Sequence, residues 1–146
     1  MKEQSAVGFL IAKIHQLSGR IFTKLLKNHQ IEINPAQGRI MFVLWREDNI
    51  TIQKLAKKTS LGKSTLTPML DRLEEMGYIK RVPSKSDRRK ILIQLTEKDR
   101  NLQNEYVLIS REMTDLFYDN FSTEEITQFE SYLQRLFENL QKYESK

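Results

Sequence analysis

A short, strongly basic segment has the clearest chemistry in this sequence of 146 residues. Residues 83–90 include four basic side chains, Lys85, Arg88, Arg89 and Lys90, and a single acidic one, Asp87. An arginine in such a segment can enter the narrow minor groove of DNA, where the potential is most negative. Asp87 precedes Arg89 by two positions and could hold its guanidinium through a bidentate pair. The alternative is a solvated, charged turn.

A second group of polar residues lies upstream, where Lys63 is followed by Ser64, Thr65 and Thr67. Small hydroxyl side chains at the start of a helix let the backbone approach DNA and can bond to base edges or phosphates. The N–H groups of the helix N-terminus also favour phosphate. The alternative is that Ser64 only caps a solvated first turn. Pro68 lies past that first turn, so we expect a local distortion of the helix there.

Positive charge is concentrated in the middle third of the chain. Residues 51–100 carry thirteen Lys/Arg and six Asp/Glu, whereas residues 101–146 carry four and nine. A phosphate-facing surface requires such clustering and a solvated surface does not. Other basic side chains are candidates for phosphate contacts, although each alone is more simply explained as surface charge: Lys54, Lys57, Arg72, Lys80 and Arg81.

The elements that must position these residues follow the order helix, short turn, helix, hairpin. Thr51 is a possible N-cap of a first short helix, and a second helix is expected over about 63–76. Gly77 suits the end of that helix. Strands at 78–82 and 91–95 then flank the basic segment as a hairpin. This is the order of a winged helix-turn-helix, in which the second helix enters the major groove of DNA.

Long amphipathic helices are expected on both sides of this motif. Apolar residues recur at spacings of three and four over residues 6–29, and again in two C-terminal helices separated by a capping box at Ser122 and Glu125. Asn34 and Pro35 mark the start of one more helix. These apolar stripes form more surface than a small helix-turn-helix can cover. Part of this surface is therefore expected to meet a second copy of the chain. Packing of the helices against one another is the alternative.

The sequence therefore predicts a mainly α fold with a small β-hairpin wing, as one compact domain. Residues 33–99 are expected to bind DNA, and residues 1–32 and 100–146 to form the helical dimerisation region. No apolar run approaches the roughly 20 residues of a membrane span, and the N-terminus lacks the apolar core of a secretory signal. These features indicate a cytoplasmic protein.

Residue content argues against catalysis and metal binding. The 146 residues include no cysteine and only two histidines, His15 and His29. That content excludes thiolate sites and leaves little for a transition metal, so we expect neither a metal nor a cofactor. No Ser/His/Asp grouping, phosphate-cradling glycine loop or marked pair of carboxylates indicates an enzyme.

Four stretches, residues 33–37, 61–67, 70–81 and 87–90, carry a resemblance that covers nearly the whole chain. Together they resemble the MarR family, the multiple-antibiotic-resistance type of bacterial transcription regulator. The last stretch is the most specific, because Asp87, Arg88 and Arg89 match the family's wing signature of Asp, any residue, Arg.

The resemblance implies a homodimer, joined by its first and last helices, that binds a palindromic operator. It also implies a repressor that leaves DNA when a small phenolic or other aromatic acid binds between the dimer helices and the DNA-binding lobe. By position, Ser64, Thr65 and Thr67 would lie in the major groove, and Arg89, held by Asp87, in the minor groove. An activator, or a regulator acting through protein partners without a ligand, is the alternative.

Two details concern what such a protein would sense. Residues 65–70 are similar to the branch of the family that senses organic peroxides through an N-terminal cysteine, but Gly8 occupies the matching position. That thiol chemistry is therefore excluded. His15, Trp45 and Tyr106 are candidates for lining a ligand crevice, although an interface histidine and core aromatics are the more ordinary explanation.

Overall fold

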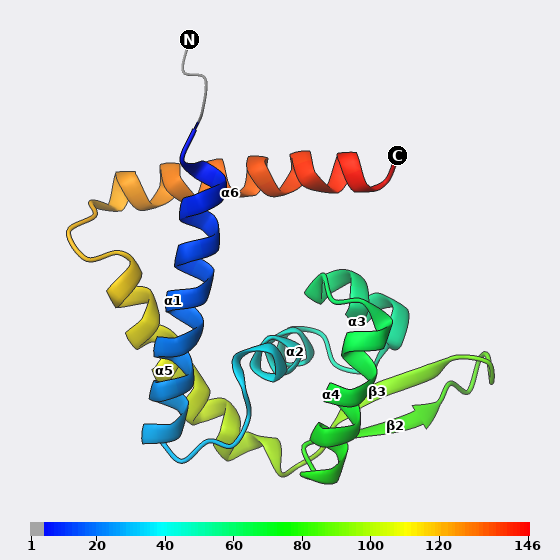
Figure 1. The fold of residues 1–146 in the computed structure, drawn as a ribbon. Coiled ribbons are helices and arrows are strands. Elements are labelled where there is room, and N and C mark those ends of the chain that lie inside the picture. The colour runs from blue at the N-terminus through cyan, green and yellow to red at the C-terminus, as the bar shows by residue number, and fades with distance from the viewer. Residues whose placement is uncertain (1–4) are drawn as a thin grey trace. The chain divides into compact units, whose positions relative to one another are not determined.

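The computed structural model, drawn in Figure 1, describes residues 5–146 apart from the side chain of Asp99. The elements in chain order are α1 (Val7–Asn28), α2 (Pro35–Arg46), β1 (Ile50–Thr51), α3 (Ile52–Thr59), α4 (Lys63–Glu75), β2 (Ile79–Pro83), β3 (Ile91–Leu95), α5 (Asp99–Phe117) and α6 (Thr123–Glu144). They divide into two compact units, residues 1–110 and 111–146, with the division inside α5. The sequence led us to expect one compact domain. The continuous buried core ends at Ile109, so the later residues form a unit of their own.

Local signals set the ends of the helices in the first unit, as expected from the sequence. The Asn34 side chain accepts from the Gln37 N–H at 2.8 Å, and the Gln37 side chain accepts from the Asn34 N–H at 2.9 Å. Thr51 caps α3 by accepting from the Lys54 N–H at 3.1 Å. Gly77 follows α4 with φ +86°, a conformation that glycine adopts without strain. The helix α4 continues through Pro68, so the distortion expected there does not end it.

The wing is a three-stranded antiparallel sheet with the strand order β1-β3-β2. In β2 and β3, Ile79 pairs with Leu95 and Pro83 with Ile91, which confirms the expected hairpin. The third strand, β1, pairs Ile50 with Ile93 and was not expected, because two residues are too few to show a period. In Figure 1 the free end of the hairpin projects beyond α3 and α4.

The core of the first unit holds α4 in place through a leucine stripe. Leu66, Leu70 and Leu73 recur at four and three residues and are fully buried. They pack with the rest of one buried cluster, which consists of Leu26, Ile31, Ile33, Ile40, Met41, Leu44, Ile50, Leu55, Ile79, Ile93, Leu102, Tyr106 and Ile109. The opposite face of α4 is consequently left to polar residues.

The second unit joins the end of α5 to α6 through a capped turn. Ser122 accepts from the Glu125 N–H at 3.1 Å, and the Glu125 side chain accepts from the Ser122 N–H at 2.8 Å, as the sequence predicts. The Tyr118 hydroxyl donates to Glu130 at 2.6 Å. This carboxylate raises the pKa of Tyr118 to about 12 because it stabilises the protonated hydroxyl.

Large apolar side chains remain exposed on α1 and on α6. Those on α1 are Val7, Phe9, Leu10, Ile11, Ile14 and Leu17, and those on α6 are Phe129, Tyr132, Leu133, Phe137, Leu140 and Tyr143. Several exposed apolar side chains on one helix are typical of a surface that binds another protein. None of the helices within the described residues is long and apolar enough to cross a membrane.

We expect Gly38→Ala to lower the free energy of unfolding by about 1–3 kcal/mol, as overpacking does in other cores. A methyl group there would meet the Tyr106 hydroxyl and lie 2.6 Å from Tyr106 Cε2. Urea denaturation measures the change. Gly19→Ala is the matched control, since a methyl at that α1 position meets nothing within 4 Å and improves helix propensity. Equal effects of the two substitutions would contradict the packing of Tyr106 on α2.

Candidate nucleic-acid interface

The exposed N-terminus of α4 is the first part of the interface. Gly62 is its N-cap and provides no side-chain hydrogen bond, whereas α2, α3 and α6 each have a side-chain cap. The Thr65 N–H donates to the Gly62 carbonyl at 3.1 Å, so the N–H groups of Lys63 and Ser64 are the ones available to an anion, which the partial positive charge of the helix end also attracts. Lys63, Ser64 and Thr65 are all exposed beside them.

One hydroxyl of α4 has a fixed hydrogen-bonding direction. Thr67 Oγ1 donates to the carbonyl of Lys63 at 2.9 Å, so its single proton is used within the helix. The oxygen keeps lone pairs and can accept from a base amino group. Arg72, further along the helix, lies 3.6 Å from Glu75 and is exposed.

The tip of the wing is held by hydrogen bonds to the Ser84 side chain and by hydrogen bonds between backbone groups. The buried Ser84 hydroxyl accepts from the N–H groups of Ser86 and Asp87, both at 3.3 Å. Across the turn, the Ser84 N–H donates to the Lys90 carbonyl and the Lys90 N–H donates to the Asp87 carbonyl, both at 2.9 Å. The tip is a defined turn for this reason, with Arg88, Arg89 and Lys90 exposed on it.

Asp87 and Arg89 form the pair that their spacing predicts. Arg89 Nε donates to Asp87 Oδ1 at 3.2 Å and Nη2 to Oδ2 at 3.4 Å, and the Arg89 N–H donates to Oδ1 at 3.1 Å. These hydrogen bonds lower the pKa of Asp87. The Arg89 side chain is nevertheless 91% exposed, against 29% for Asp87. The guanidinium is therefore oriented without being buried.

The other candidate phosphate contacts differ in whether an acidic side chain already pairs with them. Lys54 pairs with Glu47 on exposed surface, as does Lys58, which was not one of the candidates, and these contacts lower the pKa of Glu47. Lys57 and Lys80 are exposed.

Arg81 has a different role from the phosphate contact considered from the sequence. Its Nη2 lies 2.6 Å from Asp71 Oδ1 and 2.7 Å from Glu74 Oε1. Hydrogen bonding to Arg81 lowers the pKa of Glu74, and the two carboxylates raise the pKa of Arg81. With its guanidinium engaged by two carboxylates, Arg81 is not free to bind a phosphate.

Sequence reasoning missed two structural contributions to the interface. Ser84 gave only a general signal, since serine commonly hydrogen-bonds to a nearby backbone in turns. The contacts of Arg81 join residues seven and ten positions apart in different elements, and no short-range pattern marks them.

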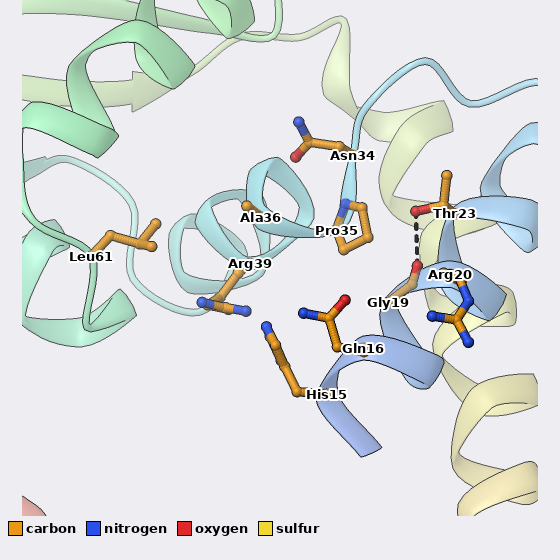
Figure 2. A pocket seen from close by; sticks show the side chains of 10 residues that line it. All are labelled: His15, Gln16, Gly19, Arg20, Thr23, Asn34, Pro35, Ala36, Arg39 and Leu61. Atoms are coloured by element: carbon orange, nitrogen blue, oxygen red, sulfur yellow. Dashed lines mark hydrogen bonds between the residues drawn. The ribbon is translucent and has the colours of Figure 1, made fainter. Parts of the chain in front are cut away.

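A pocket of about 620 Å³ lies beside the interface, between α1 and α2 (Figure 2). Its lining residues are His15, Gln16, Gly19, Arg20, Thr23, Asn34, Pro35, Ala36, Arg39 and Leu61. Figure 2 shows His15, Gln16 and Arg39 pointing toward one another, while Arg20 extends away from them. Leu61 is the residue before Gly62, the N-cap of α4. The pocket thus lies next to the start of that helix.

Trp45 and Tyr106, two of the three residues considered for a ligand crevice, are not among the residues that line this pocket. Tyr106 is buried and packs edge-on against Phe22 with ring centroids 5.5 Å apart, and its ring lies 5.3 Å from that of Trp45. Burial raises the pKa of Tyr106 to about 12. The structure separates this aromatic group from His15, which does line the pocket.

Known proteins match both the interface and the chain around it. The MarR family model matches residues 33–91. The organic hydroperoxide resistance transcriptional regulator of Bacillus subtilis (strain 168) is 34% identical over 142 residues, which cover 96% of this chain and 92% of that regulator. TtmR of Methylorubrum extorquens (strain PA1) is 35% identical over 85 residues, but these cover only 58% of this chain and 43% of TtmR.

Solved structures share the fold. A mutant MarR from E. coli, crystallised with operator DNA, has a TM-score of 0.80 at 26% identity over 89% of this chain and 92% of that one. Bordetella bronchiseptica BpsR, whose DNA binding is regulated by 6-hydroxynicotinic acid, has a TM-score of 0.81 at 22% identity over 92% and 93%. The relatives are transcription regulators and not enzymes. With its helix-turn-helix, its exposed basic wing and a relative matched over nearly its full length, this chain belongs to the MarR family of DNA-binding transcription regulators.

Proposed function

We propose that the chain is a ligand-responsive homodimeric repressor that binds a palindromic operator. The observation that carries this proposal is the wing pair. Arg89 is almost fully exposed, yet Asp87 holds it in one geometry. An exposed arginine gains nothing for the fold from such a contact, whereas a groove-binding arginine gains pre-organisation.

The proposed DNA contacts divide between the two grooves. Lys63, Ser64, Thr65 and Thr67 would approach base edges and phosphates in the major groove, where the N-terminus of α4 is open to anions. Arg89 would enter the minor groove. Arg72, Arg88 and Lys90 would neutralise phosphates beside these contacts. The operator complex of the E. coli relative supports DNA binding by this fold.

The proposed dimer follows from the exposed apolar surface of α1 and α6. A second copy would cover that surface and make the assembly two-fold symmetric. The reading helices, α4 in each copy, would then meet two half-sites about 34–36 Å apart, which requires a palindrome.

The proposed ligand is a small aromatic acid bound in the pocket between α1 and α2. His15 provides a hydrogen-bond donor, Arg39 provides donors and a positive charge, and Pro35, Ala36 and Leu61 provide apolar surface. BpsR supports this choice, because an acid of that type regulates its DNA binding. A ligand touching Leu61 would act at the start of α4 and favour one placement of that helix over another.

Organic hydroperoxides are not the proposed signal, although the name of the Bacillus subtilis relative refers to them. The 146 residues contain no cysteine, so a thiol cannot be oxidised in them. A reversible ligand therefore fits this chain better than a covalent oxidant.

Operator binding tests the wing contact. Operator sites selected from genomic or random DNA should be palindromic, and Arg89→Ala should weaken binding to them by about 1–3 kcal/mol. Fluorescence anisotropy measures the affinity at fixed salt. Arg111→Ala on α5 is the control, because it removes the same charge from an exposed residue that lies neither on the wing or α4 nor on α1 or α6, and it should leave affinity unchanged. Full affinity in Arg89→Ala would refute the groove contact.

The pH dependence of the wing pair follows from the lowered pKa of Asp87. A carboxyl with a depressed pKa keeps its ionic contact at neutral pH and loses it as the pH falls through that lowered pKa. In a carboxyl NMR titration, Asp87 of the wild type should therefore titrate at lower pH than Asp87 in Arg89→Ala. Coincident titrations would show that the pair does not form in solution.

Release by aromatic acids tests the pocket. We expect benzoic acid, hydroxybenzoic acids or 6-hydroxynicotinic acid to release the operator, and Arg39→Met to raise the concentration needed by tenfold or more. Without ligand, Arg39→Met should bind the operator as the wild type does. Lys24→Met, on α1 but not among the lining residues, is the control. Equal release of both variants would place the ligand elsewhere.

A further inference from the structure

Arg81 joins the wing to α4 near the base of the hairpin. Its guanidinium lies between Asp71 and Glu74, with Nε donating to Glu74 Oε1 at 3.2 Å and Nη2 bridging both carboxylates. The Arg81 N–H donates to the other Glu74 oxygen at 3.2 Å. We call the contacts of Asp71, Glu74 and Arg81 the Arg81 clamp. Its arginine is 25% exposed, much less than the arginine at the wing tip.

The charges of the clamp are unfavourable for binding DNA directly. Asp71, Glu74 and Glu75 place three carboxylates on the reading helix, where each one repels phosphates. Glu75 lies 3.6 Å from Arg72, whereas Asp71 and Glu74 both contact Arg81 at 2.6–2.7 Å. Acidic residues on a DNA-reading helix reduce its affinity unless they serve another purpose, and here two of them hold one arginine of the wing.

We propose that Arg81 is a positioning residue for DNA binding: the Arg81 clamp fixes the tilt of the wing against α4. Arg89 can then reach the minor groove while α4 lies in the major groove. The free end of the hairpin projects beyond α3 and α4 (Figure 1). Because each strand residue advances about 3.3 Å, any change of tilt at Arg81 is magnified at the tip. This inference rests on the proposed wing contact.

The direction in which one substitution changes operator affinity distinguishes a positioning role from an effect of charge. Glu74→Gln keeps the size of the side chain and removes a negative charge from the reading helix, so charge alone predicts tighter operator binding. The clamp predicts weaker binding, by threefold or more. Glu75→Gln is the matched control, since it removes the same charge from the same helix outside the clamp, and it should bind as tightly as the wild type or more tightly. Arg81→Lys should weaken binding as well, because an ammonium cannot reproduce the forked contacts.

A double-mutant cycle tests whether Glu74 affects operator binding through the position of Arg89 on the wing. In an Arg89→Ala background, Glu74→Gln should change operator affinity by less than twofold, because the contact that it misplaces is already gone. Tighter or unchanged binding by Glu74→Gln in the wild-type background would overturn the proposal, as would the same weakening in both backgrounds. Circular dichroism monitors folding. If Glu74→Gln is unfolded, Asp71→Asn replaces it with the same expected outcomes. Failure of the wing contact itself would be seen separately, as undiminished affinity in Arg89→Ala alone.

Discussion

The DNA-binding surface depends on holding positive charge in place without burying it. A buried cation loses its hydration and cannot reach a phosphate, whereas an exposed one is held by little packing. This chain places carboxylates beside its arginines instead. Asp87 orients Arg89 at the tip of the wing, and Asp71 and Glu74 hold Arg81 lower on the hairpin. The exposed Asp87–Arg89 pair adds little to stability, so its value lies in geometry.

On the reading helix, α4, the buried face keeps the residues of the exposed face in place. Leu66, Leu70 and Leu73 are buried completely and leave α4 little freedom to rotate or slide. The positions of Lys63 and Ser64 on the other face are consequently set by apolar packing that they do not themselves make. The N-terminus of α4 has no side-chain cap, so N–H groups of its first turn point outward along the helix axis.

Features set by neighbouring residues could be predicted from the sequence, and features set across elements could not. The N-cap at Asn34, the turn at Gly77 and the Asp87–Arg89 pair each depend on a few consecutive residues. The Arg81 clamp depends instead on how a strand packs against a helix. Tyr106 was considered for a crevice, with a core aromatic as the more ordinary explanation, and it is buried in the core, where the absence of a side chain at Gly38 leaves room for its ring.

The clamp also constrains how a ligand could act on the proposed repressor. If Arg81 joins the wing to α4, the two cannot be displaced independently, and a ligand must move them as one body. The pocket touches that body at Leu61, immediately before α4, and its other lining residues lie on α1, on α2 and at Asn34, the α2 N-cap. A ligand that favours one placement of Leu61 over another would therefore change the spacing of whole reading units across a dimer. The operator would then be released because the spacing of the two reading units no longer matches the two half-sites. The arrangement of α4 and the wing within each unit would stay unchanged.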